Sequence, residues 1–131
     1  MPTYEMLKKI LFFFSPENAH NIAEFVFKFF SNYCQVVPSY LVTKYFVTDK
    51  MLEQRLFDVT FLNPVGIAAG FDKNATMIKM LTSLGFGHVE YGTMTPLAQS
   101  GNKKPRMFRY PEFQTIQNAM GFNNDGMSVA K

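Results

Sequence analysis

The stretch NPVGIAAGFDKN, residues 63–74, runs from apolar residues directly into a polar, glycine-containing end. Val65, Ile67 and Ala68 do not alternate with polar residues, which is typical of a parallel strand covered on both faces. Gly70 and the polar residues after it follow with almost no turn. In parallel α/β proteins, ligands bind where the strands end. This stretch therefore predicts a buried strand that ends at a binding site.

A helix and a second strand are predicted next along the chain. Residues 74–87 place an apolar face on one side of a helix, and Gly85 is a natural stop for it. That face consists of Met77, Ile78, Met80, Leu81 and Leu84. The residues HVEYGTMTP, 88–96, then have the composition of a strand. Strand, helix and strand together form the βαβ unit of a parallel sheet.

The first third of the chain is predicted to be helical. Residues 4–14 form a short amphipathic helix, and Ser15 caps a second helix that starts with Pro16 and Glu17. The second helix carries one broad apolar stripe, made of Ile22, Phe25, Val26, Phe29, Phe30 and Tyr33. We expect Pro38 to end this helical region.

The stripe has two readings that the sequence leaves open. It either packs on the rest of the protein or lies on a bilayer, with Lys8, Lys9 and Lys28 facing lipid headgroups. The longest uninterrupted apolar run near the N-terminus, Ile10 to Phe14, is shorter than the roughly 7–15 residues of a signal-peptide core. We expect no cleaved signal and no transmembrane helix.

The remaining segments are predicted to be less regular. Residues 39–50 form a connection, and LFDVTF, 56–61, forms one arm of a short hairpin. The residues after Pro96 form a long, loop-rich stretch with many aromatic and methionine residues. Long loops in compact domains are usually functional or disordered, and this composition favours function.

Composition limits the classes of function. The chain has 131 residues, 47% of them hydrophobic, which suits one packed domain. Its net charge of +3 is weak and scattered, and this argues against a nucleic-acid partner. Cys34 is the single cysteine, so the chain forms no internal disulfide and no cysteine-based metal site.

Three places carry candidate binding residues. Lys73 supplies a cation after the first strand, and Thr93 and Thr95 supply hydroxyl groups after the second. Ala68, Ala69 and Gly70 are small enough to let a flat ligand approach the backbone. The third place is NAMGFNN, residues 118–124. Each also has a structural reading: a solvated loop lysine, strand-forming threonines and turn-forming asparagines.

Together these segments resemble a known family. NPVGIAAGFDKN, LGFGHVEYGTMTP, GNKKPRMFRYP and NAMGFNNDG occur in an order and at spacings similar to the N-terminal part of class 2 dihydroorotate dehydrogenases. SPENAH, residues 15–20, resembles the membrane-associated helical hairpin of that family. The resemblance implies an α/β fold: the N-terminal part of a (β/α)8 TIM barrel preceded by a helical hairpin extension, with the barrel incomplete in this chain.

The resemblance also implies an activity. Members oxidise dihydroorotate to orotate in pyrimidine biosynthesis through bound FMN, which passes electrons to ubiquinone or menaquinone. It implies FMN-binding residues Ala69, Gly70, Phe71, Asp72, Lys73 and Thr93, and substrate-binding residues Lys73, Asn118, Ala119, Met120, Gly121 and Phe122. His20 and Arg109 match positions near the quinone. Many relatives carry an arginine where this chain has Ala119.

The resemblance sets expectations for organisation as well. Residues 1–50 would form the membrane- and quinone-associated extension, and residues 51–131 the start of the FMN-binding barrel. The catalytic serine base would lie outside this chain, and we assign no catalytic residue and no metal site within it. We expect a peripheral membrane protein on the cytoplasmic face of a bacterial inner membrane, and we expect the isolated chain to be inactive without the remainder of the barrel.

Other functions remain open at this point. One is a membrane-surface interaction module without catalysis, which would bind liposomes without flavin absorbance. Another is a related barrel oxidoreductase that uses FMN on a different substrate. A third is a fragment that needs the rest of the barrel as a separate chain.

Overall fold

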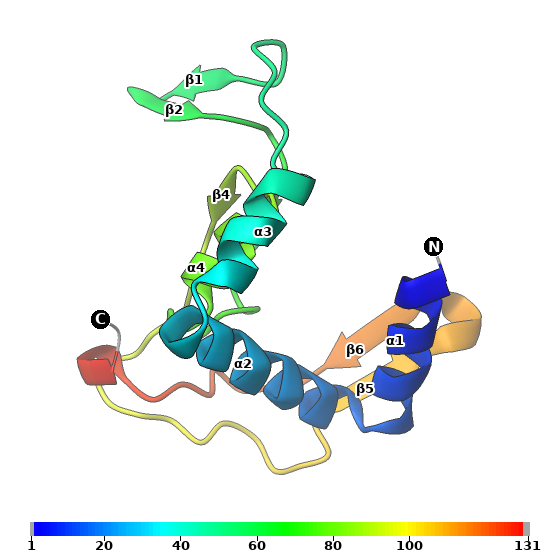
Figure 1. Ribbon diagram of the computed structural model, residues 1–131. Helices are drawn as coiled ribbons and strands as arrows, with labels where there is room; N and C mark the ends of the chain where they lie inside the picture. The colour runs from blue at the N-terminus through cyan, green and yellow to red at the C-terminus, as the bar shows by residue number, and fades with distance from the viewer. Residues whose placement is uncertain (1, 130–131) are drawn as a thin grey trace.

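The computed structural model describes residues 2–129 (Figure 1). Its helices are α1 (Pro2–Phe13), α2 (Pro16–Tyr33), α3 (Val36–Tyr45) and α4 (Ile78–Ser83), with short 3-10 helices η1 (Pro111–Phe113) and η2 (Met127–Val129). Its strands are β1 (Gln54–Leu56), β2 (Val59–Phe61), β3 (Gly66–Ile67), β4 (His88–Val89), β5 (Met107–Tyr110) and β6 (Thr115–Asn118).

The strands form three separate pairs. β1–β2 and β5–β6 are antiparallel, and β3–β4 is parallel, with Gly66 opposite His88 and Ile67 opposite Val89. Helix α4 connects β3 to β4, so the predicted βαβ unit is confirmed. Gly85 ends this helix region with a φ of +91°, in the left-handed region where a glycine C-cap is favoured.

The helical region extends further than the sequence indicated. The hydroxyl of Ser15 accepts a hydrogen bond from the amide of Asn18 at 3.4 Å, which confirms the predicted cap of α2. The prediction that Pro38 ends the helices is wrong, because Pro38 lies in the first turn of α3. A first-turn residue has no intrahelical acceptor for its amide, so proline is tolerated there. Most of the predicted 39–50 connection is therefore helix.

Two hairpins also differ from the prediction. Residues 56–61 span both arms and the turn of β1–β2, because Phe57 and Asp58 both have positive φ values, 52° and 59°. A two-residue turn with two positive φ values matches the right-handed twist of a hairpin. The stretch after Pro96, predicted as loop, contains the β5–β6 hairpin.

The apolar core of the described residues is small and is formed mainly by α2 and α4. Ala19, Met77, Met80 and Leu81 are its buried apolar residues. The expectation of a strand covered on both faces is wrong for the described residues, since β3 is only half-buried and Val65 is 60% exposed. Parallel strands acquire that cover from neighbouring strands and helices, and here β3 pairs with β4 alone.

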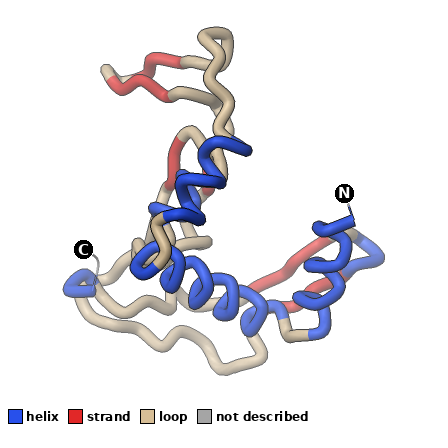
Figure 2. Tube along the Cα trace, in the orientation of Figure 1, coloured by secondary structure: helices blue, strands red, loops and turns tan. Residues whose placement is uncertain are grey.

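Helix α2 lies at the centre of the molecule (Figures 1 and 2). It contacts α1, α3, α4 and β5, while the β1–β2 hairpin extends away from the other elements. No helix within residues 2–129 has both the length and the apolar character needed to cross a membrane.

Asp72 lies in the loop between β3 and α4 and bonds to the start of the helix. Its carboxylate is 1% exposed and accepts backbone hydrogen bonds from Thr76 at 2.9 Å and Met77 at 2.8 Å. These amides precede the first turn of α4 and have no helical acceptor. The buried carboxylate therefore fixes where the helix begins.

Asp72→Asn is expected to destabilise the protein, because one carboxylate oxygen becomes an NH2 group facing a buried amide. A buried donor left unpaired costs about 1–3 kcal/mol in the free energy of unfolding. Asp49→Asn is the matched control, since Asp49 accepts one bond from the amide of Met51 at an exposed site. Urea unfolding measures both, and equal midpoints for the two variants would contradict the role of Asp72.

Candidate functional site

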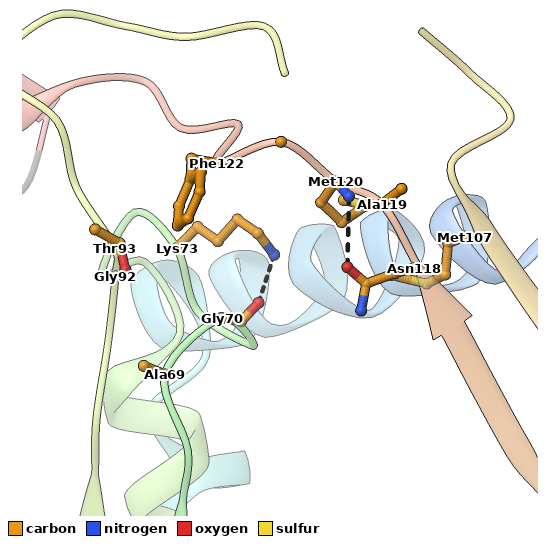
Figure 3. Close-up of a pocket in the computed structure, with 11 residues that line it drawn as sticks. Ala69, Gly70, Lys73, Gly92, Thr93, Met107, Asn118, Ala119, Met120 and Phe122 are labelled. Atoms are coloured by element: carbon orange, nitrogen blue, oxygen red, sulfur yellow. Dashed lines mark hydrogen bonds between the residues drawn. The ribbon is translucent and has the colours of Figure 1, made fainter. Parts of the chain in front are cut away.

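A cavity of about 560 Å³ opens beyond the ends of β3, β4 and β6 (Figure 3). The lining residues are Ala69, Gly70, Lys73, Gly92, Thr93, Met107, Asn118, Ala119, Met120, Gly121 and Phe122. These residues come from four parts of the chain: residues 69–73, residues 92–93, Met107 of β5 and residues 118–122. The fold thus brings the three candidate places of the sequence together in one pocket.

Backbone hydrogen bonds hold the first two walls together. The amide of Gly70 donates to the carbonyl of Gly92 at 2.8 Å, and the amide of Gly92 donates to the carbonyl of Asp72 at 2.9 Å. This places Thr93 beside the loop that follows β3. A Cβ atom added at Gly70 would meet no atom within 4 Å, so the backbone there faces open space. Because no side chain covers the backbone at Gly70, a flat ligand is able to contact the main chain there.

Lys73 carries the charge of the pocket wall. Its Nζ donates to the carbonyl of Gly70 at 2.5 Å, as Figure 3 shows. Burial lowers the pKa of Lys73 below its usual value of 10.5, and the positive charge of Arg106 lowers this pKa further. A partly buried ammonium group in a cavity is suited to bind an anion.

Residues 118–122 form the facing wall. Asn118 ends β6, and its side-chain oxygen accepts a hydrogen bond from the amide of Met120 at 3.4 Å. Gly121 and Phe122 follow with positive φ values of 73° and 56°. This turn brings Phe122 back to the pocket, although its side chain is 68% exposed.

A second cavity of about 370 Å³ lies between α2 and the end of β3. His20 lines it and packs edge-to-face on Phe71, with ring centroids 4.9 Å apart. Burial, followed by the nearby charge of Lys73, lowers the pKa of His20 below its usual 6.5. The two cavities share Ala69, Gly70, Lys73 and Met107 as a common wall.

The structure separates some of the predicted site residues. Phe71 lines the second cavity only, and the carboxylate of Asp72 is turned to the start of α4. The guanidinium carbon of Arg109 lies 4.0 Å from the ring centroid of Phe12, so Arg109 is placed against α1 and not in the cavity with His20. A binding role for any of these side chains stays a prediction.

Sequence reasoning missed Met107 and Arg106. Met107 lies in the lining of both cavities, and Arg106 before it is buried. Both follow Pro105 in the motif GNKKPRMFRYP, of which only Arg109 is a predicted site residue. Arg106 is buried against Glu17 of α2, whereas Arg109 is half-buried against Phe12 of α1, and no pattern in the sequence signals that difference.

The fold and the pocket define a class. A parallel βαβ unit with a cavity at the carboxyl ends of its strands is the arrangement of ligand sites in (β/α)8 barrel enzymes. The chain belongs to the dihydroorotate dehydrogenase family, since the profile of the family described as Dihydroorotate dehydrogenase matches residues 51–131. This confirms the family and the fold class that the sequence motifs indicated.

Similar curated proteins agree. Over 128 residues the chain is 60% identical to a protein of a Nitratiruptor species, named dihydroorotate dehydrogenase (quinone). It is 52% identical over 131 residues to one of Sulfurimonas denitrificans with the same name. The matches cover 98% and 100% of this chain, and 36% and 37% of those relatives. The chain thus spans about a third of their length.

Solved structures show the same likeness. DHODH of Eimeria tenella in complex with ferulenol superposes with a TM-score of 0.70 and 38% identity, over 88% of this chain and 28% of that one. The ligand-free form of the same enzyme gives a TM-score of 0.69 with 38% identity, over 88% of this chain and 30% of that one. The described segments therefore have the spatial arrangement of the corresponding part of a DHODH.

The lowered pKa of Lys73 predicts a pH effect on stability. In the unfolded chain this amine keeps its proton up to about pH 10.5, whereas the folded protein releases it at lower pH. The penalty for burying the charge is therefore present at neutral pH and is relieved as pH rises between these two values. The free energy of unfolding of the wild type, minus that of Lys73→Met, should rise between about pH 7 and about pH 10. Urea titrations measure it, and a falling difference would contradict the burial of this charge.

Proposed function

We propose that this chain supplies the first part of a quinone-dependent dihydroorotate dehydrogenase, and that its two cavities hold the substrate side and the acceptor side of one FMN site. The supporting observation is the wall shared by the two cavities, made of Ala69, Gly70, Lys73 and Met107. A flat cofactor along this wall contacts both cavities. When bound, FMN would supply the redox chemistry of hydride acceptance from dihydroorotate and electron transfer to a quinone.

The residues present fit such a group. The backbone at Gly70 faces open space, and Ala69 has the smallest side chain after glycine, so a planar ring is able to lie against the main chain. Thr93 adds a hydroxyl from the neighbouring strand end. Backbone from Ala69 to Lys73, together with Thr93, would hold the ring, and the rest of the barrel would contribute its other contacts.

The facing wall suits a small planar anion. Asn118 carries an amide with both donor and acceptor groups, and Lys73 carries a positive charge in the same cavity. Orotate and dihydroorotate carry a carboxylate and ring amide groups, which match this pair. We propose that Asn118 to Phe122 orient the substrate and that Lys73 neutralises its negative charge.

The second cavity is the proposed quinone site. It opens beside α2 and is lined by Phe71, Ile67 and Met107, with His20 as a polar group at the α2 side. A largely apolar cavity with two polar groups, His20 and the shared Lys73, suits a ring that carries carbonyl oxygens and an apolar tail. Arg109 lies on Phe12 and does not line this cavity, so of the two predicted quinone residues we include only His20 in the proposed quinone site.

Lys73→Met tests the proposed substrate side. In the full-length, FMN-loaded protein this variant is expected to lower dihydroorotate-dependent quinone reduction by about 100- to 1,000-fold, as for the loss of one preorganised charge in an active site. Orotate affinity, followed by the change in flavin absorbance, should fall with it. Stopped-flow and steady-state assays measure these quantities.

Lys79→Met is the matched control. Lys79 lies on the exposed face of α4 and contacts Gln35, away from both cavities. Its removal should leave rate and orotate affinity unchanged. Wild-type activity that persists in Lys73→Met would refute the proposed site, and a wild type that neither binds orotate nor oxidises dihydroorotate would refute the proposed function.

We also propose that the helical extension lies on a membrane surface, where a quinone is found. The apolar side chains of α1 and α2 are widely exposed: Ile10 54%, Phe13 88%, Phe25 71%, Phe29 48% and Tyr33 78%. Lys8 and Lys9 lie on the same helix as Phe13. Apolar side chains flanked by lysines are typical of interfacial helices.

Replacement of Phe13 and Phe25 together by Ser should reduce binding to anionic phospholipid vesicles by about 100-fold or more, because burial of each phenyl ring is worth about 1.5–3 kcal/mol and about 1.4 kcal/mol is a factor of ten in affinity. Phe57→Ser is the control, since Phe57 is 95% exposed at the tip of the separate β1–β2 hairpin. Vesicle co-sedimentation measures binding. Equal loss with Phe57→Ser would show non-specific apolar contact, and no loss in either variant would favour a protein partner for the helices.

A further inference from the structure

Arg106 is a buried guanidinium at the junction of three segments. Its side chain is 7% exposed. Nη1 donates to the carbonyls of Ser100 at 2.5 Å, Asn102 at 3.0 Å and Met120 at 3.5 Å. Nε and Nη2 donate to Oε1 of Glu17 at 3.2 and 2.8 Å. The planar fork of an arginine thus joins loop residues, the pocket wall and α2 at one point.

Glu17 is the partner contributed by the helical extension. It lies in the first turn of α2, and its side chain is 12% exposed. The hydrogen bond from Arg106 lowers the pKa of Glu17 below its usual 4.5, and Lys104 at 3.2 Å adds to the effect. Lys104 is itself 60% exposed, so Arg106 is the shielded partner of this carboxylate.

The other end of the Arg106 network is the substrate wall proposed above. The amide of Ala119 donates to the carbonyl of Arg106 at 2.8 Å, and the amide of Asn102 donates to the carbonyl of Met120 at 3.0 Å. The side chain of Asn102 donates to the carbonyl of Ala119 at 2.9 Å. Ala119 and Met120 both line the first cavity.

The atoms around Gly101 at this junction are closely packed. A Cβ atom at Gly101 would lie 2.2 Å from the carbonyl oxygen of Met120 and 2.7 Å from Nη1 of Arg106. The guanidinium and the carbonyl of Met120 are therefore closely packed around Gly101, and Nη1 donates to that carbonyl at 3.5 Å. The chain of contacts runs from α2 through Glu17 and Arg106 to the pocket wall without a gap.

We propose that Glu17 and Arg106 are positioning residues that couple docking of the helical extension to the geometry of segment 118–122. Substrate affinity then depends on an ion pair outside the pocket. By thermodynamic reciprocity, substrate in the pocket also stabilises the docked extension. The identity of the substrate in this proposal rests on the proposed function. The hydrogen bonds that link Glu17, Arg106 and segment 118–122 do not depend on that function.

The chain offers an internal control for this coupling. Helix α2 has a second polar contact with the barrel segment, from the hydroxyl of Thr76 to Oε1 of Glu24 at 3.0 Å. That contact reaches the start of α4 and not segment 118–122. Glu17→Gln therefore removes the negative charge from one polar link of α2, and Thr76→Val removes the hydroxyl of the other; only the first link is connected to the pocket wall.

The test uses the full-length, FMN-loaded protein and two readouts. Glu17→Gln should accelerate amide exchange at Asn102 and Ala119 by about tenfold, since a hydrogen bond to a charged group contributes on that scale. It should weaken orotate binding, and raise the KM for dihydroorotate more than it lowers kcat. Exchange at Gly87 and Glu90, which bond to the β3 region, should not change. Thr76→Val should leave all four amides and orotate affinity at wild-type values.

Three outcomes overturn the proposal: no change at Asn102 and Ala119 in Glu17→Gln, the same changes in Thr76→Val, or general acceleration that includes Gly87 and Glu90. Where Glu17→Gln does not fold, Arg106→Lys keeps the charge but lacks the fork, and it should give the same pattern. A wild type that binds no orotate refutes the proposed function instead, and amide exchange alone then decides the coupling.

Discussion

The buried guanidinium of Arg106 is the interaction on which the described structure depends most. A charge removed from water is strongly unfavourable unless it is paired and hydrogen-bonded. Here the guanidinium is hydrogen-bonded to three backbone carbonyls and paired with the carboxylate of Glu17. These partners belong to a loop, to the pocket wall and to α2. Loss of one partner from a buried pair costs about 3–5 kcal/mol, so the three segments are fixed relative to one another.

A second set of bonds fixes the opposite wall of the pocket. Asp72 starts α4 with its carboxylate, while its carbonyl accepts from Gly92 after the neighbouring strand. The loops after β3 and β4 are thereby joined to each other. Lys73 follows Asp72 directly, so its amine enters the cavity from a rigid position. Both walls are thus set by polar contacts, and few apolar residues of the described chain are buried.

The sequence predicted the local elements well where a single segment decides them. The Ser15 cap and the Gly85 stop depend on residues that are neighbours in the chain, and the βαβ unit lies within the continuous segment 66–89. It was wrong about Pro38, because proline ends a helix or begins one according to its place in the turn. It also placed residues 56–61 in one arm, since the positive φ values of Phe57 and Asp58 are not marked by glycine.

The sequence by itself determined the family, the βαβ unit and three of the four segments that line the pocket, because motif, spacing and hydrophobic period are properties of the chain. Only the tertiary structure decided which side chains face that pocket. It turned Asp72 to α4, laid Arg109 on Phe12 and buried Arg106 against Glu17. The physical reason is that burial and ion pairing join residues 89 positions apart, and no local pattern records which of two nearby arginines meets the carboxylate.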